Sequence, residues 1–184
     1  ILDAIFTTFD LARMNVCETA MREGLLYDML GRALHTDSRG TSIGALAERY
    51  GIDPAQANRV SDTAGQLFEQ AASGWSLDAQ AQEMLHWCAQ VHEIGLAIAH
   101  SQHHVHGAYI MANSDLAGFS RQEQAQFACI LRSHRRRPDA DTLRNLPPRM
   151  QPVTQRLTAL LRLATLLHRA RSDEQLPPIR LSTN

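Results

Sequence analysis

The segment from Val153 to Ala170 constrains the fold of this chain more than any other. Its leucines recur every three or four residues, which places them along one face of a helix. They are Leu157, Leu160, Leu161, Leu163, Leu166 and Leu167. An apolar face of this width has to be buried against other elements, so we expect this segment to be a core helix.

Helix signals recur along the rest of the chain. Asp53 followed by Pro54, with Gln56 three residues after the cap, predicts a helix to about Ala72. Ser120 and Glu123 match a capping box and predict a helix to about Ser133. Further helices are expected over 1–12, 18–34 and 43–50, and from Ser76 or Asp78 to near Gly95. With only 5% aromatic residues, the composition also favours helix, and we expect an all-α bundle of about seven helices.

The remaining segments carry turn signals. Residues 35–40 (HTDSRG) are expected to form a loop, and residues 135–152 should be mostly loop because they contain four prolines. A strand could begin at 179–181, after Pro177 and Pro178. Because the chain starts at Ile1 without a methionine, we interpret it as part of a longer protein.

Charge is distributed unevenly along the chain. Residues 1–120 contain 6 arginines and 14 acidic residues, whereas residues 121–184 contain 12 arginines and 5 acidic residues. Lysine is absent. A basic C-terminal third favours contact with an anionic partner, and the guanidinium group suits phosphate because it donates two hydrogen bonds at once.

The cysteines and the hydropathy exclude several protein classes. Cys17, Cys88 and Cys129 are widely separated, which supports neither a zinc site nor a disulfide framework and fits reduced thiols in the cytoplasm. No apolar run reaches the roughly 18 residues that a membrane span needs.

Six of the nine histidines lie between residues 86 and 106. His92–Glu93 is a candidate metal-ligand pair, although the HExxH zinc motif is excluded because position 96 is Leu96. An HD-type phosphohydrolase pattern, in which His and Asp residues from several helices hold two metals, remains open. Hydrogen-bonded or surface histidines are equally open. Arg135, Arg136 and Arg137 could be a solvated loop or a phosphate-contacting one.

Segments in order across residues 14–167 resemble the exopolyphosphatase / guanosine pentaphosphate phosphohydrolase family. They are MREGLLYD at 21–28, HEIG at 92–95, HS at 100–101, HVH at 104–106, NSDLAGFS at 113–120, SHRR at 133–136 and LRLA at 161–164. Ala117 stands where the family usually has proline. Together these segments are highly specific, whereas each alone would be weak.

The resemblance implies an HD-like C-terminal domain over residues 35–184, preceded by a linker helix in residues 1–34. It implies that two N-terminal domains of the acetate kinase/actin type carry the hydrolysis, with Mg²⁺ or Mn²⁺ as cofactor, so no catalytic residue is expected here. The expected substrate is inorganic polyphosphate or guanosine pentaphosphate, and the expected assembly is a homodimer. We predict no specific nucleic-acid partner.

The resemblance and the charge pattern together give two candidate sites. Phosphate contacts are predicted for Arg22, His134, Arg135, Arg136 and Arg137. The degenerate HD site would consist of His92, Glu93, His106 and His134.

This HD site departs from the family pattern at three positions. Gln56 replaces a histidine, Glu93 an aspartate and Thr165 a late aspartate, which disfavours a tight dimetal site. An autonomous HD-type nucleotide hydrolase and a purely structural dimerisation module remain alternatives.

Overall fold

The computed structural model describes residues 6–8, 10, 38–138, 140–172 and 176–182. The chain divides into two compact units, Ile1–Asp37 and Ser38–Asn184. In the first unit, residues 6–8 are helical, whereas the predicted helix over 18–34 and Arg22 lie outside the described residues.

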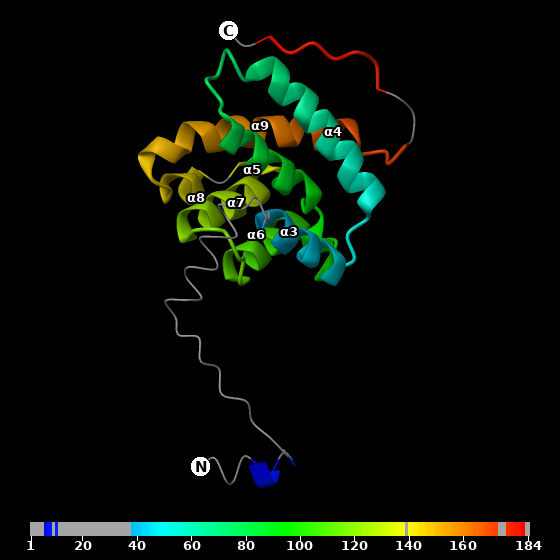
Figure 1. Cartoon of the computed structure of the whole chain (residues 1–184). Helices are drawn as coiled ribbons and strands as arrows, with labels where there is room; N and C mark the ends of the chain where they lie inside the picture. Colours follow the sequence, from blue (N-terminus) through cyan, green and yellow to red (C-terminus); the bar gives the residue numbers. More distant parts are fainter. Residues whose placement is uncertain (1–5, 9, 11–37, 139, 173–175, 183–184) are drawn as a thin grey trace. The chain divides into compact units, whose positions relative to one another are not determined.

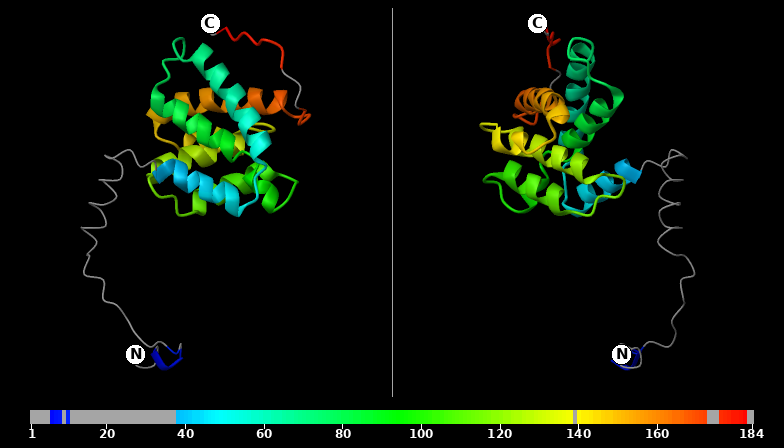
Figure 2. Two further views of the ribbon diagram at one scale, coloured as in Figure 1. Left: turned by 45° about the vertical axis from the view of Figure 1, so that its right-hand side comes forward. Right: turned by 90° about the vertical axis from the view of Figure 1, so that its left-hand side faces the viewer.

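The second unit is a bundle of helices. In chain order these are α3 (Ser38–Arg49), α4 (Pro54–Ala71), α5 (Ala79–Gln90), η1 (Ile94–Ala97), α6 (His103–Asn113), α7 (Arg121–Ser133), α8 (Ala140–Arg144), η2 (Pro148–Met150) and α9 (Gln151–Leu167). Helix α4 packs on α5, α6 packs on α7, and α9 runs across α4, α5 and α7 (Figure 1 and Figure 2). The part of the chain that the structure describes contains no strand, so the all-α prediction is confirmed.

Helix starts follow the predicted capping signals. The Asp53 carboxylate accepts hydrogen bonds from the backbone N–H groups of Ala55 and Gln56, and Asp78 rather than Ser76 caps α5. At α7 the capping box is complete: Ser120 Oγ accepts from the Glu123 N–H, and the Glu123 carboxylate accepts from the Ser120 N–H. These caps satisfy backbone donors that the first helical turn leaves unpaired.

Helix α9 confirms only half of the predicted apolar stripe. Leu157, Leu160 and Leu161 are fully buried against the neighbouring helices. Leu163 and Leu166, by contrast, are 39% and 62% exposed. The last turns of α9 therefore extend past the core, although the leucine spacing continues.

The predicted loop over 35–40 is wrong for residues 38–40, which form the first turn of α3. Tertiary contacts of Arg39 override the local turn signal. Its Nε donates to Gly118 O at 2.9 Å, and its Nη2 lies 2.9 Å from Glu123 Oε1. Its guanidinium also lies over the Trp87 and Phe119 rings, and these contacts tie the turn to α5 and α7.

The C-terminal segment is extended but forms no strand among the described residues. Figure 1 shows it passing near the C-terminal end of α4. There the side chain of Gln70 makes hydrogen bonds to its backbone. Gln70 Nε2 donates to Ile179 O at 3.2 Å, and Leu181 N donates to Gln70 Oε1 at 2.8 Å. In the predicted loop over 135–152, residues 135–138 and 145–147 lie outside helices, whereas α8, η2 and the start of α9 are helical.

Among the residues described, no helix is both long enough and apolar enough to cross a bilayer.

Candidate functional site

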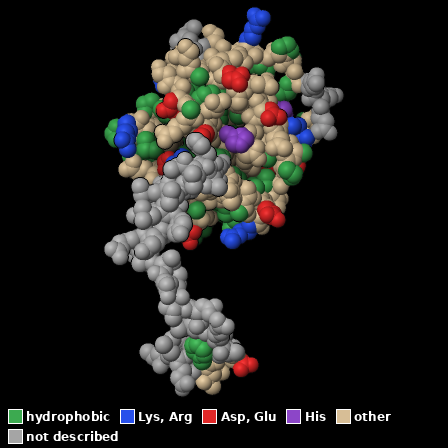
Figure 3. All heavy atoms as spheres, in the orientation of Figure 1, with side chains coloured by type: hydrophobic (Ala, Val, Ile, Leu, Met, Phe, Trp, Pro, Cys, Tyr) green, Lys and Arg blue, Asp and Glu red, His purple; other side chains and the backbone are tan. Residues whose placement is uncertain are grey.

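Four histidines come together at one end of the bundle. His92 follows α5, His103 and His104 begin α6, and His134 ends α7. The His134 ring lies 6.0 Å from His92, 5.8 Å from His103 and 6.4 Å from His104, measured between centroids. All four are buried. On the face drawn in Figure 3, histidine shows only as isolated purple patches.

Two glycines allow this cluster to form. A Cβ on Gly95 would lie 1.9 Å from the carbonyl oxygen of His103 and 2.6 Å from the Gly107 nitrogen. A Cβ on Gly107 would lie 3.2 Å from Ile94 Cγ2. The backbone of η1 therefore packs directly on the first turn of α6, and this contact fixes His92 relative to His103.

Backbone carbonyls set the tautomers of His92 and His134. His92 Nδ1 lies 2.7 Å from Ala89 O, and His134 Nδ1 lies 2.6 Å from Leu131 O. Because a carbonyl oxygen only accepts, each Nδ1 carries the proton and donates. Burial lowers the pKa of both rings, strongly for His134, so near neutral pH each keeps an unprotonated Nε2.

His103 and His104 are in a different situation. The Nδ1 atoms of both rings are buried and have no hydrogen-bond partner among the described residues. Burial, assisted by the nearby charge of Arg135, lowers the pKa of His103 to about 4. Buried polar atoms are almost always paired in native proteins, so these two nitrogens are exceptions among the described residues.

A cavity of about 690 Å³ opens beside this cluster. Its lining is rich in basic side chains and contains one carboxylate. The lining residues are His92, His100, His103, His134, Arg135, Arg136, Arg162, Arg169, Arg171, Gln56, Glu93, Leu96, Thr165 and Leu166. The charges give the cavity a positive field, which favours anions.

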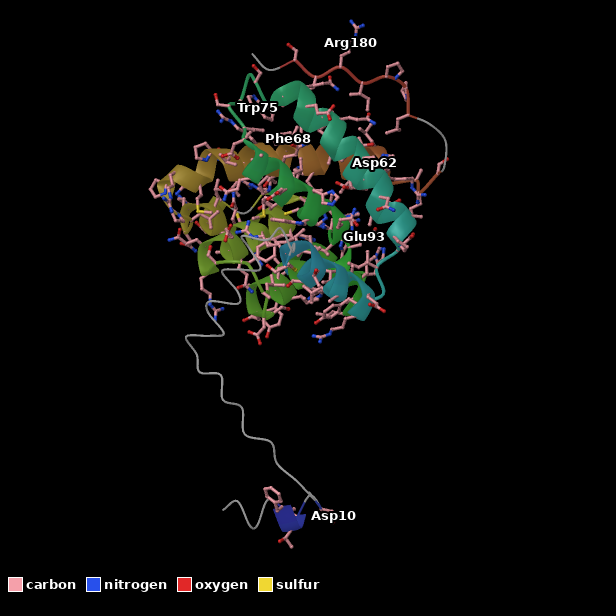
Figure 4. All side chains as sticks on the ribbon, in the orientation of Figure 1. Asp10, Asp62, Phe68, Trp75, Glu93 and Arg180 are labelled. Carbon is pink, nitrogen blue, oxygen red and sulfur yellow. The ribbon has the colours of Figure 1, made fainter. Side chains whose placement is uncertain are left out.

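Its single lining carboxylate, Glu93, is already paired. Arg171 Nη2 donates to Glu93 Oε1 at 2.7 Å and to Oε2 at 2.6 Å. Arg171 Nη1 also donates to Asp53 Oδ2 at 3.1 Å, so one guanidinium bridges two carboxylates. Figure 4 shows Glu93 beside the N-terminal end of α4, the helix that Asp53 caps.

Two further positions of the HD pattern are engaged by the chain. Gln56 Oε1 accepts from Arg59, and Gln56 Nε2 donates to His168 O at 3.0 Å. Thr165 Oγ1 donates to Arg162 O. Gln56 thus links helices instead of closing a capping box with Asp53.

These contacts bear on the predicted metal site. Within the described ranges, no group of three or more His, Cys, Asp or Glu side chains is arranged to hold a metal ion. His92, Glu93 and His134 lie together, whereas His106 does not line the cavity. In this structure the cation that lies against the Glu93 carboxylate is the guanidinium of Arg171. The predicted metal site therefore stays a prediction.

The structure brings only some of the predicted phosphate ligands together at the cavity. His134, Arg135 and Arg136 line the cavity, while Arg137 is exposed outside it and Arg22 lies outside the described residues. The prediction missed Arg162, Arg169, Arg171 and His103. The high arginine content of the C-terminal third indicated that arginines were important. It did not show which of them line the cavity.

Two other histidines join helices. His86 Nδ1 lies 2.8 Å from Ser61 Oγ, and His168 Nε2 lies 2.7 Å from Thr63 Oγ1. Both side-chain pairs hold α4 to a neighbouring helix. His86 and His168 therefore fit the alternative of hydrogen-bonded histidines.

Residues 38–183 match the family model described as Ppx/GppA phosphatase, domain III. The match covers the whole of the helical bundle described above.

Proposed function

Because the chain belongs to the Ppx/GppA phosphatase family, whose domain III it contains, we propose that it is the polyphosphate-binding module of an exopolyphosphatase. In this role the module binds and guides the chain of phosphates and supports dimerisation. It does not itself cleave the phosphoanhydride bond.

The observation that carries this proposal is the arginine-lined cavity. Five arginines and four histidines line it against one carboxylate, and Arg171 already neutralises that carboxylate. Such a surface binds a linear polyanion favourably, because each phosphate contact also releases counterions. Arg135 and Arg136 are exposed at the cavity and are the residues we assign to direct phosphate contact.

The other residues have lesser roles in this proposal. His134 borders the same cavity, and Arg137 continues the basic segment toward solvent. Arg22 is assigned to phosphate by its resemblance to the family segment alone. Hydrolysis itself, with Mg²⁺ or Mn²⁺, belongs to the N-terminal domains of the family, and guanosine pentaphosphate is the alternative substrate. A cytoplasmic location remains a prediction.

A double substitution tests the binding role. Arg135→Ala with Arg136→Ala should weaken binding of long-chain polyphosphate and lower its salt dependence by about one unit of slope per lost contact. Affinity would be measured by fluorescence anisotropy from low to moderate salt. Unchanged affinity at low salt would remove the proposal.

The two alternatives give different results. An autonomous metal-dependent hydrolase would retain metal in near-stoichiometric amount after purification, which elemental analysis detects. A purely structural module would form a dimer by size-exclusion chromatography with light scattering but would bind no polyanion.

A further inference from the structure

A second cavity, of about 570 Å³, lies where the N-terminal turns of three helices meet. Asp78, which caps α5, Ser120, which caps α7, and Met150, which precedes α9, all contribute to its lining. It shares no lining residue with the arginine-lined cavity, so the two are separate. Its volume lies in the range typical of pockets for small molecules.

The buried amide of Gln126 is the observation that indicates a ligand. Gln126 is only 7% exposed and lines the cavity, yet its side chain makes no hydrogen bond to any other described residue. Gln124, two residues earlier on the same helix, is 5% exposed and donates to Met111 O at 2.8 Å and also to Ser114 O. A glutamine buried to this degree is normally paired by the protein, as Gln124 is. The amide of Gln126 is instead available to whatever occupies the cavity.

The charges of the cavity lining are balanced. The lining carries two arginines and two carboxylates, and Arg39 Nη2 lies 2.9 Å from Glu123 Oε1. Arg149 Nη2 donates to Gln122 Oε1 at 3.1 Å, and the Asp78 carboxylate is engaged in capping α5. Each of the four charged groups therefore has a partner, and the lining carries no net charge that would select an ion. Such a lining favours an uncharged ligand.

Apolar side chains form much of the cavity wall. Met84 and Trp87 are buried, and Met150 and Val153 are partly buried. A flat ring fits such walls well, because its faces make dispersion and sulfur–aromatic contacts while its edge stays free for hydrogen bonds. The walls therefore favour a planar ring over a flexible chain.

Glutamine amides would meet the edge of such a ring. Gln126 lies in the interior of the cavity, and Gln80 and Gln122 are exposed residues of the same lining. An amide both donates and accepts, so it matches a ring edge on which a carbonyl oxygen or ring nitrogen lies next to an N–H group.

We propose that this cavity binds an uncharged planar heterocycle with an amide-like edge, the chemistry shared by nucleobases and nicotinamide. Gln126 pairs with the edge of the ring, Gln80 adds a further hydrogen bond, and the methionines contact the ring faces. The proposal does not depend on the proposed function, because neither Arg135 nor Arg136 lines this cavity.

Fluorescence of Trp87 measures binding at the cavity itself. The chain contains two tryptophans, and the other one, Trp75, does not line the cavity. Figure 4 shows Trp75 beyond the C-terminal end of α4. In a Trp75→Phe chain, uridine, adenosine and nicotinamide are titrated, and at least one should change the Trp87 emission with a dissociation constant below about 1 mM. No response to any of the three probes at about 5 mM would overturn the proposal.

Gln80 and Gln82 form a matched pair for a substitution test. Both are exposed residues of α5, and only Gln80 lines the cavity. Gln80→Ala should weaken binding of the responding probe about fivefold, the effect expected for losing one neutral hydrogen bond. Gln82→Ala should leave the affinity unchanged. Equal losses from the two substitutions would contradict binding in this cavity.

Gln126→Met replaces the buried amide by an apolar side chain of similar length. Probe binding should weaken about tenfold, because the hydrogen bonds to the ring edge are lost. The denaturant midpoint should not fall, because the amide that is removed has no partner in the fold. A lower midpoint would show that the protein itself pairs this amide, and an unchanged affinity would show that the ligand does not. Either result would overturn the proposal.

The probes also identify the source of the ring. Binding of uridine or adenosine without nicotinamide assigns a nucleobase, the reverse assigns nicotinamide, and binding of all three assigns the shared edge. Gln126→Met should leave polyphosphate affinity unchanged, and Arg135→Ala with Arg136→Ala should leave probe affinity unchanged. Loss of both affinities in either variant would contradict two separate sites.

Discussion

The backbone of Gly95 lies against the carbonyl of His103 so closely that a Cβ on Gly95 would be 1.9 Å from that oxygen. Replacement by alanine must therefore push η1 away from α6. We expect Gly95→Ala to lower the free energy of unfolding by about 3 kcal/mol, at the upper end for overpacking. Chemical denaturation with circular dichroism measures this change.

Gly65 provides a matched control in the same bundle. It lies inside α4, and a Cβ there would meet no atom within 4 Å in the described structure. Alanine is favoured over glycine in a helix interior, so Gly65→Ala should raise the free energy of unfolding by about 0.5 to 1 kcal/mol. Equal effects of the two substitutions would contradict the close packing at Gly95.

Arg39 is expected to stabilise the first turn of α3. Arg39→Ala removes a bond to the Gly118 carbonyl, an ion pair with Glu123 and a contact over the Trp87 ring. The free energy of unfolding should fall by about 2 kcal/mol, because hydrogen bonds of charged groups and cation–π contacts are lost together. Arg49→Ala, an exposed change in the last turn of the same helix, should stay within about 0.5 kcal/mol. If Arg39→Ala lowers the free energy of unfolding no more than Arg49→Ala does, Arg39 does not stabilise the first turn of α3.

Stability should fall as the solution becomes acidic. In the folded chain the pKa of His103 is lowered to about 4 from its ordinary value of 6.5, chiefly by burial. Between these values the unfolded chain binds more protons, so the free energy of unfolding decreases as pH decreases. The contribution is fully present above 6.5 and is lost as pH falls through about 4.

The lowered pKa values of His92, His104 and His134 act in the same direction. The rings face one another and the charges of Arg135 and Glu93. Denaturant midpoints at about pH 7.5 and about pH 5 should therefore differ, with the lower midpoint in acid. Identical midpoints would show that these histidines are not protected from protonation in the folded state.

Local signals predicted most of the fold. Asp53, Ser120 and Glu123 cap helices through neighbours within three residues, and such contacts can be recognised in a sequence. The turn at Ser38 could not be predicted, because Arg39 stabilises it through Gly118, far along the chain. Leu163 and Leu166 continue the leucine spacing beyond the core, and periodicity alone does not show where burial ends.

The site was harder to predict for the same reason. His92, Glu93 and His134 were recognisable from the family segments, and the structure places them together. The bond from Arg171 to Glu93 joins residues 78 positions apart in the sequence, and nothing local marks Arg171 among the other arginines. His103 lies in the histidine-rich stretch, but its position depends on the packing of η1 on α6, which local sequence does not reveal.

The most direct test of the account follows binding and phosphate release in one reaction. The chain is mixed with polyphosphate and Mg²⁺ or Mn²⁺, and the bound fraction and the free phosphate are both measured over time. We expect binding without release, because in the proposed function the arginine-lined cavity only holds phosphate and the N-terminal domains of the family carry out hydrolysis. Release that His92→Ala abolishes would show that the altered HD site cleaves the bond, and would contradict the account.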